Sequence, residues 1–139
     1  MNAASPNVLA GYRVIEHCEF ISGPYAAMLL GDLGAEVIKV ERPGRGDPFR
    51  SFEHGLYGPQ FQAFNRNKKS LQLDLERPSE RELMHELLES ADVYIQNFRP
   101  GALERFGLDA PAVRPRHPRL VYCAITGFGR DGPYAHRPA

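Results

Sequence analysis

One stretch, residues 34–47, constrains the possible fold more than any other part of the chain. It reads GAEVIKVERPGRGD, and its first half is a short, almost entirely apolar run at residues 37–40. That length and composition are typical of a strand covered on both faces, as in a parallel sheet. The second half changes to Arg, Pro and Gly, which must turn. Because ligands of open α/β sheets lie beyond the carboxyl ends of the strands, we expect Glu41, Arg42 and Arg45 to face a phosphate-bearing ligand there.

The flanking segments predict an alternation of strands and helices. Residues 12–16 resemble a strand, and Gly23-Pro24 opens a nearly apolar, buried helix that Gly34 ends in a left-handed conformation. Further strands are predicted at 36–41, 70–75, 92–96 and 120–126, with helices at 78–90, 102–106 and from Asp109 to Pro115. The fold class is therefore α/β: a Rossmann-like, mostly parallel sheet with helices on both faces.

The domain organisation follows from the same alternation. Residues 1–10 are expected to be a lead-in, and residues 11–139 a single ligand-binding domain. The alternation stops after the last strand, so we expect the N-terminal part of a larger, incomplete domain. Residues 43–60 are rich in Gly, Pro and aromatic residues and are predicted to form a long, ordered, irregular loop.

The composition narrows the classes of partner. Lys and Arg number 17, as do Asp and Glu, so no overall field favours nucleic acid or a membrane surface. The N-terminus has neither the basic start nor the apolar core of an export signal, and no apolar run approaches the ~20 residues of a membrane helix. Two cysteines without paired spacing fit a reducing compartment. We expect a cytoplasmic protein that binds neither nucleic acid nor membrane.

Polar and basic residues follow three of the predicted strands, where they would meet at one edge of the sheet. They are Arg42, then Asn97, Phe98 and Arg99 with Arg105 nearby, and finally Thr126, Gly127 and Phe128. A helix beginning near Gly101 would add free backbone N–H groups, which favour an anion. Arginine forks onto phosphate oxygens, and Phe98 could cover a base or an apolar arm. Alternatively, these arginines pair with nearby acids and the NFRPG segment is only a turn.

A dinucleotide site is a weaker interpretation. Glu41 follows Gly23 at close to the ~20-residue spacing of a ribose-binding acid. The turn reads ISGPYA, however, so the Gly-x-Gly-x-x-Gly fingerprint is absent, and Pro24 removes a donor that a pyrophosphate would use.

The sequence offers no catalytic residue and no metal site that spacing supports. The five histidines are scattered, and His17 and Glu19 beside Cys18 lack a further metal ligand. His85 is predicted to lie on a solvated helix face. The basic run NRNKK at residues 65–69 is typical of an exposed patch, although it could also meet a phosphate.

Four blocks together resemble the family III CoA-transferases. They are SGPYAAMLLGDLGAEVIKVERPGRGD, NRNKKSLQLDL, ADVYIQNFRPGALERFGL and ITGFGRDGPYA, in the family's order. That family includes formyl-CoA and carnitine CoA-transferases and the related α-methylacyl-CoA racemases. The resemblance implies a Rossmann-like CoA-binding domain in a protein about three times as long, forming an interlocked homodimer. Its substrates would be CoA or acyl-CoA and a small carboxylic acid, with no separate cofactor.

The resemblance also implies which residues contact CoA. Arg42 would meet the nucleotide end, and Ile21 and Ser22 would lie near the thioester. The remaining expected contacts are Leu73, Asp74, Leu75, Glu76, Asn97, Phe98, Arg99, Arg105, Ile125, Thr126, Gly127 and Phe128. Formyl-CoA transferase-like members carry Gln in place of Ile21 and Lys in place of Thr126, which argues against formyl or oxalate specificity.

In transferases of this family an aspartate attacks the thioester and a covalent relay passes CoA to the acceptor acid. By the resemblance, that aspartate lies downstream of Ala139, as do the His and Asp of the racemases; Asp131 and His136 do not match them. We therefore expect this chain to supply much of the CoA-binding part of a transferase and to be inactive alone. The alternatives are an acyl-CoA racemase of the same fold and a CoA-binding segment without activity of its own.

Overall fold

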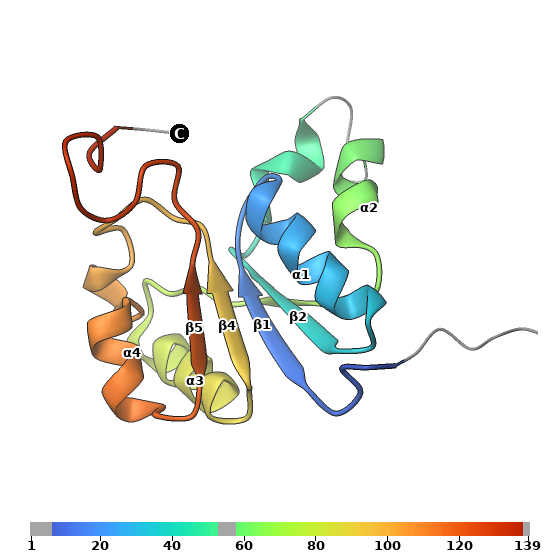
Figure 1. The fold of residues 1–139 in the computed structure, drawn as a ribbon, viewed down its shortest axis with the longest axis horizontal. Coiled ribbons are helices and arrows are strands. Elements are labelled where there is room, and N and C mark those ends of the chain that lie inside the picture. Colours follow the sequence, from blue (N-terminus) through green and yellow to red (C-terminus); the bar gives the residue numbers. More distant parts are fainter. Residues whose placement is uncertain (1–6, 53–57, 138–139) are drawn as a thin grey trace, which may run out of the picture.

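Five parallel strands form the centre of the molecule (Figure 1). The computed structural model describes residues 7–52 and 58–137. The strands are β1 (Arg13–His17), β2 (Glu36–Glu41), β3 (Lys68–Gln72), β4 (Val93–Gln96) and β5 (Val121–Ala124). Their order is β3-β2-β1-β4-β5, and Ile15 of the central strand lies opposite Ile38 on one side and Tyr94 on the other. The α/β prediction is confirmed.

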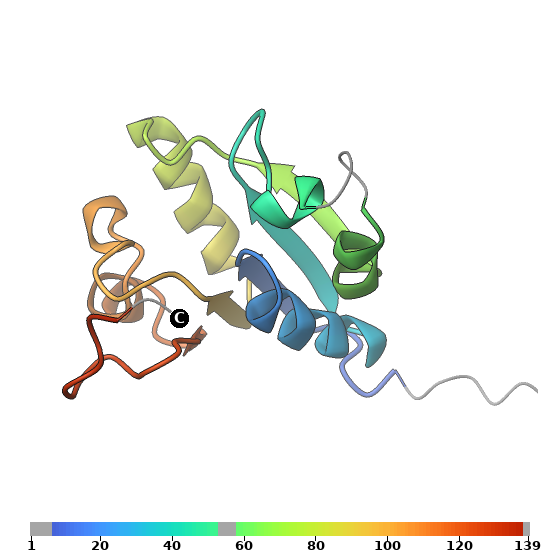
Figure 2. The same ribbon diagram turned by 90° about the horizontal axis from the view of Figure 1, so that it is seen from above.

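Helices cover both faces of this sheet. The helices are α1 (Ser22–Asp32), α2 (Pro59–Asn65), α3 (Pro78–Glu89) and α4 (Ala110–Arg116), with short 3-10 turns η1 (Pro48–Ser51) and η2 (Glu104–Phe106). Figure 2 shows α1 and α3 on opposite faces of the sheet. Each crossover returns the chain to a parallel strand, as a βαβ unit requires.

Two apolar clusters hold these layers together. Side chains alternate between the faces of a strand, so Ile15 and Tyr94 pack against the α3 side with Met84. Val14 and Ile95, one position away, belong to the cluster on the α1 side. Because both faces are covered, the central strands are buried on both sides, as the apolar run at residues 37–40 predicted.

Several predicted boundaries shift. The irregular stretch 43–60 contains η1 and the start of α2, a helix that was not predicted; its residues 53–57 lie outside the described part. Strand β3 spans 68–72 rather than 70–75. The helix expected at 102–106 is only the turn η2, and α4 runs to Arg116 with Pro115 inside it.

Two helices also differ from their predicted burial. Helix α1 is not buried all round, because Tyr25 and Leu29 are 47% and 43% exposed, and Leu33 just after the helix is 44% exposed. On α3, His85 is buried rather than solvated, while Leu83 is exposed. Gly34 does end the first helix region with a positive φ of 102°, as expected. Within the described ranges, no helix is both long and apolar enough to cross a membrane.

Candidate functional site

The strand order creates a crevice beside β1. From β1 the chain passes to β2 and β3 on one side, then returns to β4 and β5 on the other. The loops that leave β1 and β4 therefore diverge, and such a switch point is where open α/β sheets bind ligands. A cavity of about 230 Å³ lies at this edge, lined by the ends of β1 and β2 and by the loops that follow β2, β3 and β4.

Seven of the predicted CoA contacts line this one cavity. Leucine and phenylalanine side chains supply apolar walls, and two arginines supply positive charge; the seven are Arg42, Leu73, Asp74, Leu75, Glu76, Phe98 and Arg105. Arg105 pairs with Glu76 at 2.8 Å, and its guanidinium carbon lies 4.3 Å from the centre of the Phe106 ring. Across residues 7–52 and 58–137, Arg42 has no ion-pair partner. Its charge is therefore available to an anion.

Asn97 lies at the same rim but its side chain is engaged with the protein. The side-chain oxygen accepts from the Glu19 backbone N–H at 2.9 Å, and the amide nitrogen donates to the Glu19 carbonyl at 2.7 Å and to Ser22 Oγ at 3.2 Å. Asn97 thus ties the loop after β1 to the end of β4. Ile21 and Ser22 are exposed beside this link and are not part of the cavity lining.

The residues that follow β5 are not brought to the cavity. Arg99 and Thr126 line a smaller neighbouring cleft that shares Phe98 with it. Ile125 packs against the core on the α1 side, and Gly127 and Phe128 are exposed, with the Phe128 ring 6.2 Å from that of Tyr134. Among the loops that the structure describes, those after β2, β3 and β4 form the predicted rim. The loop after β5 does not take part in it.

Glu41 also lines this cavity, but its carboxylate is held by partners within the protein. Glu41 is 5% exposed, and its carboxylate accepts hydrogen bonds from Asp47 N at 2.9 Å and from Arg50 and Ser70 at 2.7 Å. Burial raises the pKa of Glu41, but the hydrogen bonds of Arg50 and Ser70 outweigh it and lower the pKa to about 2. Glu41 is a charged anchor for the loop that follows β2. Arg45, in the same loop, is exposed and outside the cavity lining.

His17 and Cys18 lie in the cavity wall without the properties of an acid–base pair. His17 Nδ1 is 3.0 Å from Tyr94 Oη, and its ring centre is 4.6 Å from that of Phe98. Burial, helped by the charge of Lys39, lowers the pKa of His17 to about 3, so it is neutral near pH 7. Burial also raises the pKa of the Cys18 thiol, which donates to the Ile95 carbonyl at 3.3 Å. No metal-binding group of three or more His, Cys, Asp or Glu side chains occurs in the described part of the chain.

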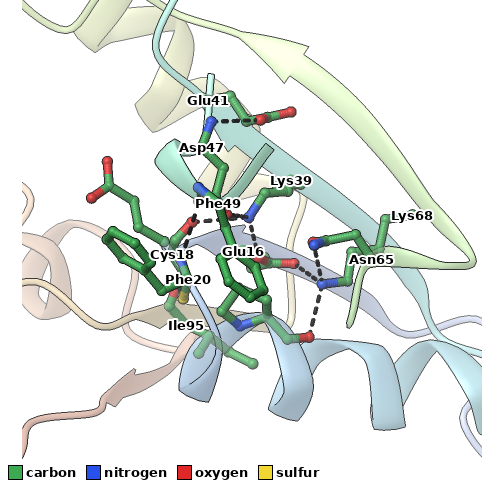
Figure 3. Close-up of polar contacts among 12 residues, drawn as sticks. Glu16, Cys18, Phe20, Lys39, Glu41, Asp47, Phe49, Asn65, Lys68 and Ile95 are labelled. Carbon is green, nitrogen blue, oxygen red and sulfur yellow. Dashed lines mark hydrogen bonds and ion pairs between the residues drawn. The ribbon is translucent and has the colours of Figure 1, made fainter. Parts of the chain in front are cut away.

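Beneath the cavity lies a buried charge network that the sequence reasoning missed, formed by Glu16, Lys39, Asp47 and Lys68 (Figure 3). Lys39 Nζ is 2.7 Å from Glu16 Oε1 and 2.9 Å from Asp47 Oδ2, and Lys68 Nζ is 2.7 Å from Glu16 Oε2. The contacts to Asp47 Oδ2 and Glu16 Oε2 are ion pairs. All four side chains are at most 2% exposed. The signal was available: a lysine in a buried strand requires partners.

The described geometry has counterparts among known proteins. The sequence profile of CoA-transferase family III matches residues 9–139. The chain is 42% identical over 136 residues to a succinate–glutarate CoA-transferase of Agrobacterium fabrum, which is 91% of this chain and 34% of the relative. It is 41% identical over 132 residues to a succinyl-CoA–D-citramalate CoA-transferase of Chloroflexus aurantiacus, covering 93% of this chain and 33% of the relative.

Solved structures agree with these relatives. A CAIB/BAIF family protein from Brucella suis superposes with a TM-score of 0.87 at 40% identity, over 94% of this chain and 36% of that one. The hypothetical protein Rv3272 from Mycobacterium tuberculosis gives a TM-score of 0.88 at 41% identity, over 99% and 38%. The chain thus spans about a third of the length of these relatives. The parallel sheet, its cavity and these likenesses together place the chain in CoA-transferase family III.

Proposed function

We propose that this chain forms the CoA-binding part of an enzyme that transfers CoA between small carboxylic acids. One observation carries the proposal: Arg42, which has no carboxylate partner among the described residues, shares a cavity with Arg105 and apolar side chains at the switch point of the sheet. CoA combines phosphates, a base and an apolar arm. Arg42 can bind a phosphate, and the Phe98 ring can pack against the base.

The substrate class follows from the relatives. Both transferases named above act on succinate or succinyl-CoA together with a second dicarboxylic acid. We therefore assign a dicarboxylate as the acid partner, and the activities of these relatives favour transfer over racemisation. Neither His17 nor Cys18 is assigned a catalytic role, because burial lowers the pKa of His17 to about 3 and raises the pKa of the Cys18 thiol. A homodimer and a cytoplasmic location remain predictions.

The test is a calorimetric titration of the chain with CoA. Arg42→Ala should weaken CoA binding about tenfold, the loss of one charge-assisted contact. Arg45→Ala is the matched control, because Arg45 is an exposed arginine of the same loop outside the cavity lining; its affinity should stay within about twofold of the unsubstituted chain.

Two results would count against the proposal. If the unsubstituted chain releases no heat with CoA, the CoA-binding assignment fails. If Arg42→Ala and Arg45→Ala bind equally well, the cavity is not where the phosphates lie. Repeating the titration with CoA that lacks its 3′-phosphate then tells which phosphate Arg42 contacts. If Arg42 contacts the 3′-phosphate, Arg42→Ala should no longer weaken binding of this ligand. If Arg42 contacts another phosphate, the loss of affinity should remain.

A further inference from the structure

Two loops that form walls of the cavity are fastened to one carboxylate, that of Asp47. Asp47 Oδ1 accepts from the backbone N–H of Phe20, in the loop after β1, at 3.1 Å. The same oxygen accepts from the backbone N–H of Phe49, in η1, at 2.9 Å. The other oxygen, Oδ2, is 2.9 Å from Lys39 Nζ (Figure 3). Asp47 therefore links the loop after β1 to the loop after β2.

The loop after β1 needs such a link. Phe20 has a φ of 62°, in the left-handed region that a residue with a β-carbon seldom adopts. A strained conformation persists only when its surroundings hold it. The hydrogen bond to Asp47 holds the Phe20 backbone from one side, and the rings of Phe20 and Phe49 lie 6.0 Å apart.

Arg42 is held by the same anchors. The turn that carries it closes with a hydrogen bond from Gly46 N to the Arg42 carbonyl at 2.9 Å. The residue before the turn, Glu41, accepts from Asp47 N at 2.9 Å, so the buried carboxylate at one end of the turn is fixed to the backbone at the other end. Lys39 in turn fixes Asp47, because its ammonium group is already held by Glu16 at 2.7 Å.

We infer that Asp47 is a positioning residue for CoA: paired with Lys39, it sets the place of Arg42 and of the loop after β1 before CoA arrives. Asp47 acts through Arg42, whose turn it fastens to the Phe20 backbone, rather than through a reacting atom. This inference rests on the proposed function, and it adds that the phosphate contact depends on a buried ion pair.

The first experiment measures CoA affinity of the full chain by calorimetry. Asp47→Asn keeps the side chain's size and one oxygen acceptor but removes the negative charge beside Lys39. CoA binding should weaken about tenfold. Asp32→Asn is the matched control: Asp32 pairs with Arg66 at the far end of α1 and does not line the cavity, so its affinity should stay within about twofold.

A double-mutant cycle separates positioning from general loosening of the fold. If Asp47 acts through Arg42, Asp47→Asn combined with Arg42→Ala should bind CoA within about twofold of Arg42→Ala alone. A further tenfold loss in the double variant would show independent effects and overturn the inference. So would a single Asp47→Asn variant that binds CoA as tightly as the unsubstituted chain does. Failure of the unsubstituted chain to bind CoA overturns the proposed function, and this inference with it.

A measurement on the unsubstituted chain covers the case in which Asp47→Asn does not fold. Without CoA, the amide hydrogen of Phe20 should exchange with solvent at least about tenfold more slowly than its intrinsic rate, because Asp47 already binds it. Adding CoA should change that rate by less than about twofold. Exchange at the intrinsic rate before CoA is added would mean that the link is not pre-formed, and would overturn the inference.

Discussion

Lys39 lies in the middle of the sheet with 1% of its side chain exposed, and three oxygen atoms surround its ammonium group. They belong to Glu16, to Asp47 and to the carbonyl of Cys18, all within 2.9 Å. Taking such charges out of water is costly, and their attraction offsets that cost only while every partner is present. Removing one partner leaves another charge buried and uncompensated.

A substitution at Lys39 tests this balance. Lys39→Met should lower the free energy of unfolding by about 3–5 kcal/mol, because it leaves Asp47 buried without a cation and Glu16 with Lys68 alone. Lys69→Met is the control. Lys69 lies on the neighbouring strand β3, but it pairs with Glu36 and has 71% of its side chain exposed. That change should cost less than about 1 kcal/mol. Similar losses in urea unfolding for the two variants would contradict the buried network.

At the scale of elements, the first turn of α1 lies very close to the loop after β1. A β-carbon added at Gly23 would lie 2.2 Å from Cys18 Sγ and 2.5 Å from Cys18 Cβ. Gly31, later in the same helix, has more room, because its nearest neighbour would be Val37 Cγ2 at 3.3 Å. The glycine at 23 thus serves close packing of the helix against the sheet, and not a dinucleotide turn.

The two glycines make a matched pair. Gly23→Ala should destabilise the chain by about 3 kcal/mol or more, since the Cys18 contact forces α1 to move. Gly31→Ala should stay within about 1 kcal/mol of the unsubstituted chain, because a gain in helix propensity offsets a tight contact. Thermal unfolding followed by circular dichroism measures both. A Gly23→Ala chain as stable as Gly31→Ala would show that α1 docks more loosely than described.

The elements that the sequence predicted correctly have a long apolar pattern, whereas those that it missed or misplaced are short or lie at the edge of the sheet. Strands and helices with a long apolar pattern, such as the run at 36–41, were predicted because burial on both faces leaves a composition signal. Helix α2 was missed: it has seven residues, starts at Pro59 and follows a glycine-rich stretch, all of which read as a loop. Strand β3 was placed two residues late because, as an edge strand, it begins with two lysines.

At the scale of the whole molecule, histidines couple stability to pH. Burial, then Lys39, lowers the pKa of His17 to about 3. Burial, then the charge of Arg116, lowers the pKa of both His85 and His117, whose Nδ1 and Nε2 atoms lie 3.1 Å apart. Below pH 6.5 the unfolded chain therefore binds more protons than the folded chain, and stability falls as the pH falls.

Acidification should show this directly. Between pH 7.5 and 5.0, His17 alone should remove about 2 kcal/mol from the free energy of unfolding, since each pH unit below 6.5 costs about 1.4 kcal/mol. Urea unfolding across that range measures the slope, which His17→Gln should flatten. His136→Gln, at an exposed position, should leave it unchanged. The raised pKa of Glu19, caused by burial and then by Asp47, opposes this trend. Parallel profiles for the chain and His17→Gln would contradict this assignment.

The candidate site was predictable only in part, for a spatial reason. Arg42, Phe98 and Arg105 were found because each follows a strand, and parallel strands end at a common edge. Thr126 follows a strand too, but β1 and β4 lie between β5 and β2, and the loop after β5 lies elsewhere. Glu16 and Asp47 lie in separate segments that meet only in three dimensions, so the sequence marks the buried Lys39 but not the two carboxylates that pair with it.

Because of the buried network, the strength of anion binding and the shape of the cavity should respond differently to salt. Its two lysines and two carboxylates sum to zero charge and lie out of reach of dissolved ions. Raising the ionic strength screens attraction between Arg42 and an anion, yet it acts far less on paired charges in the interior. Recognition can therefore weaken with salt while the walls that make it possible keep their shape.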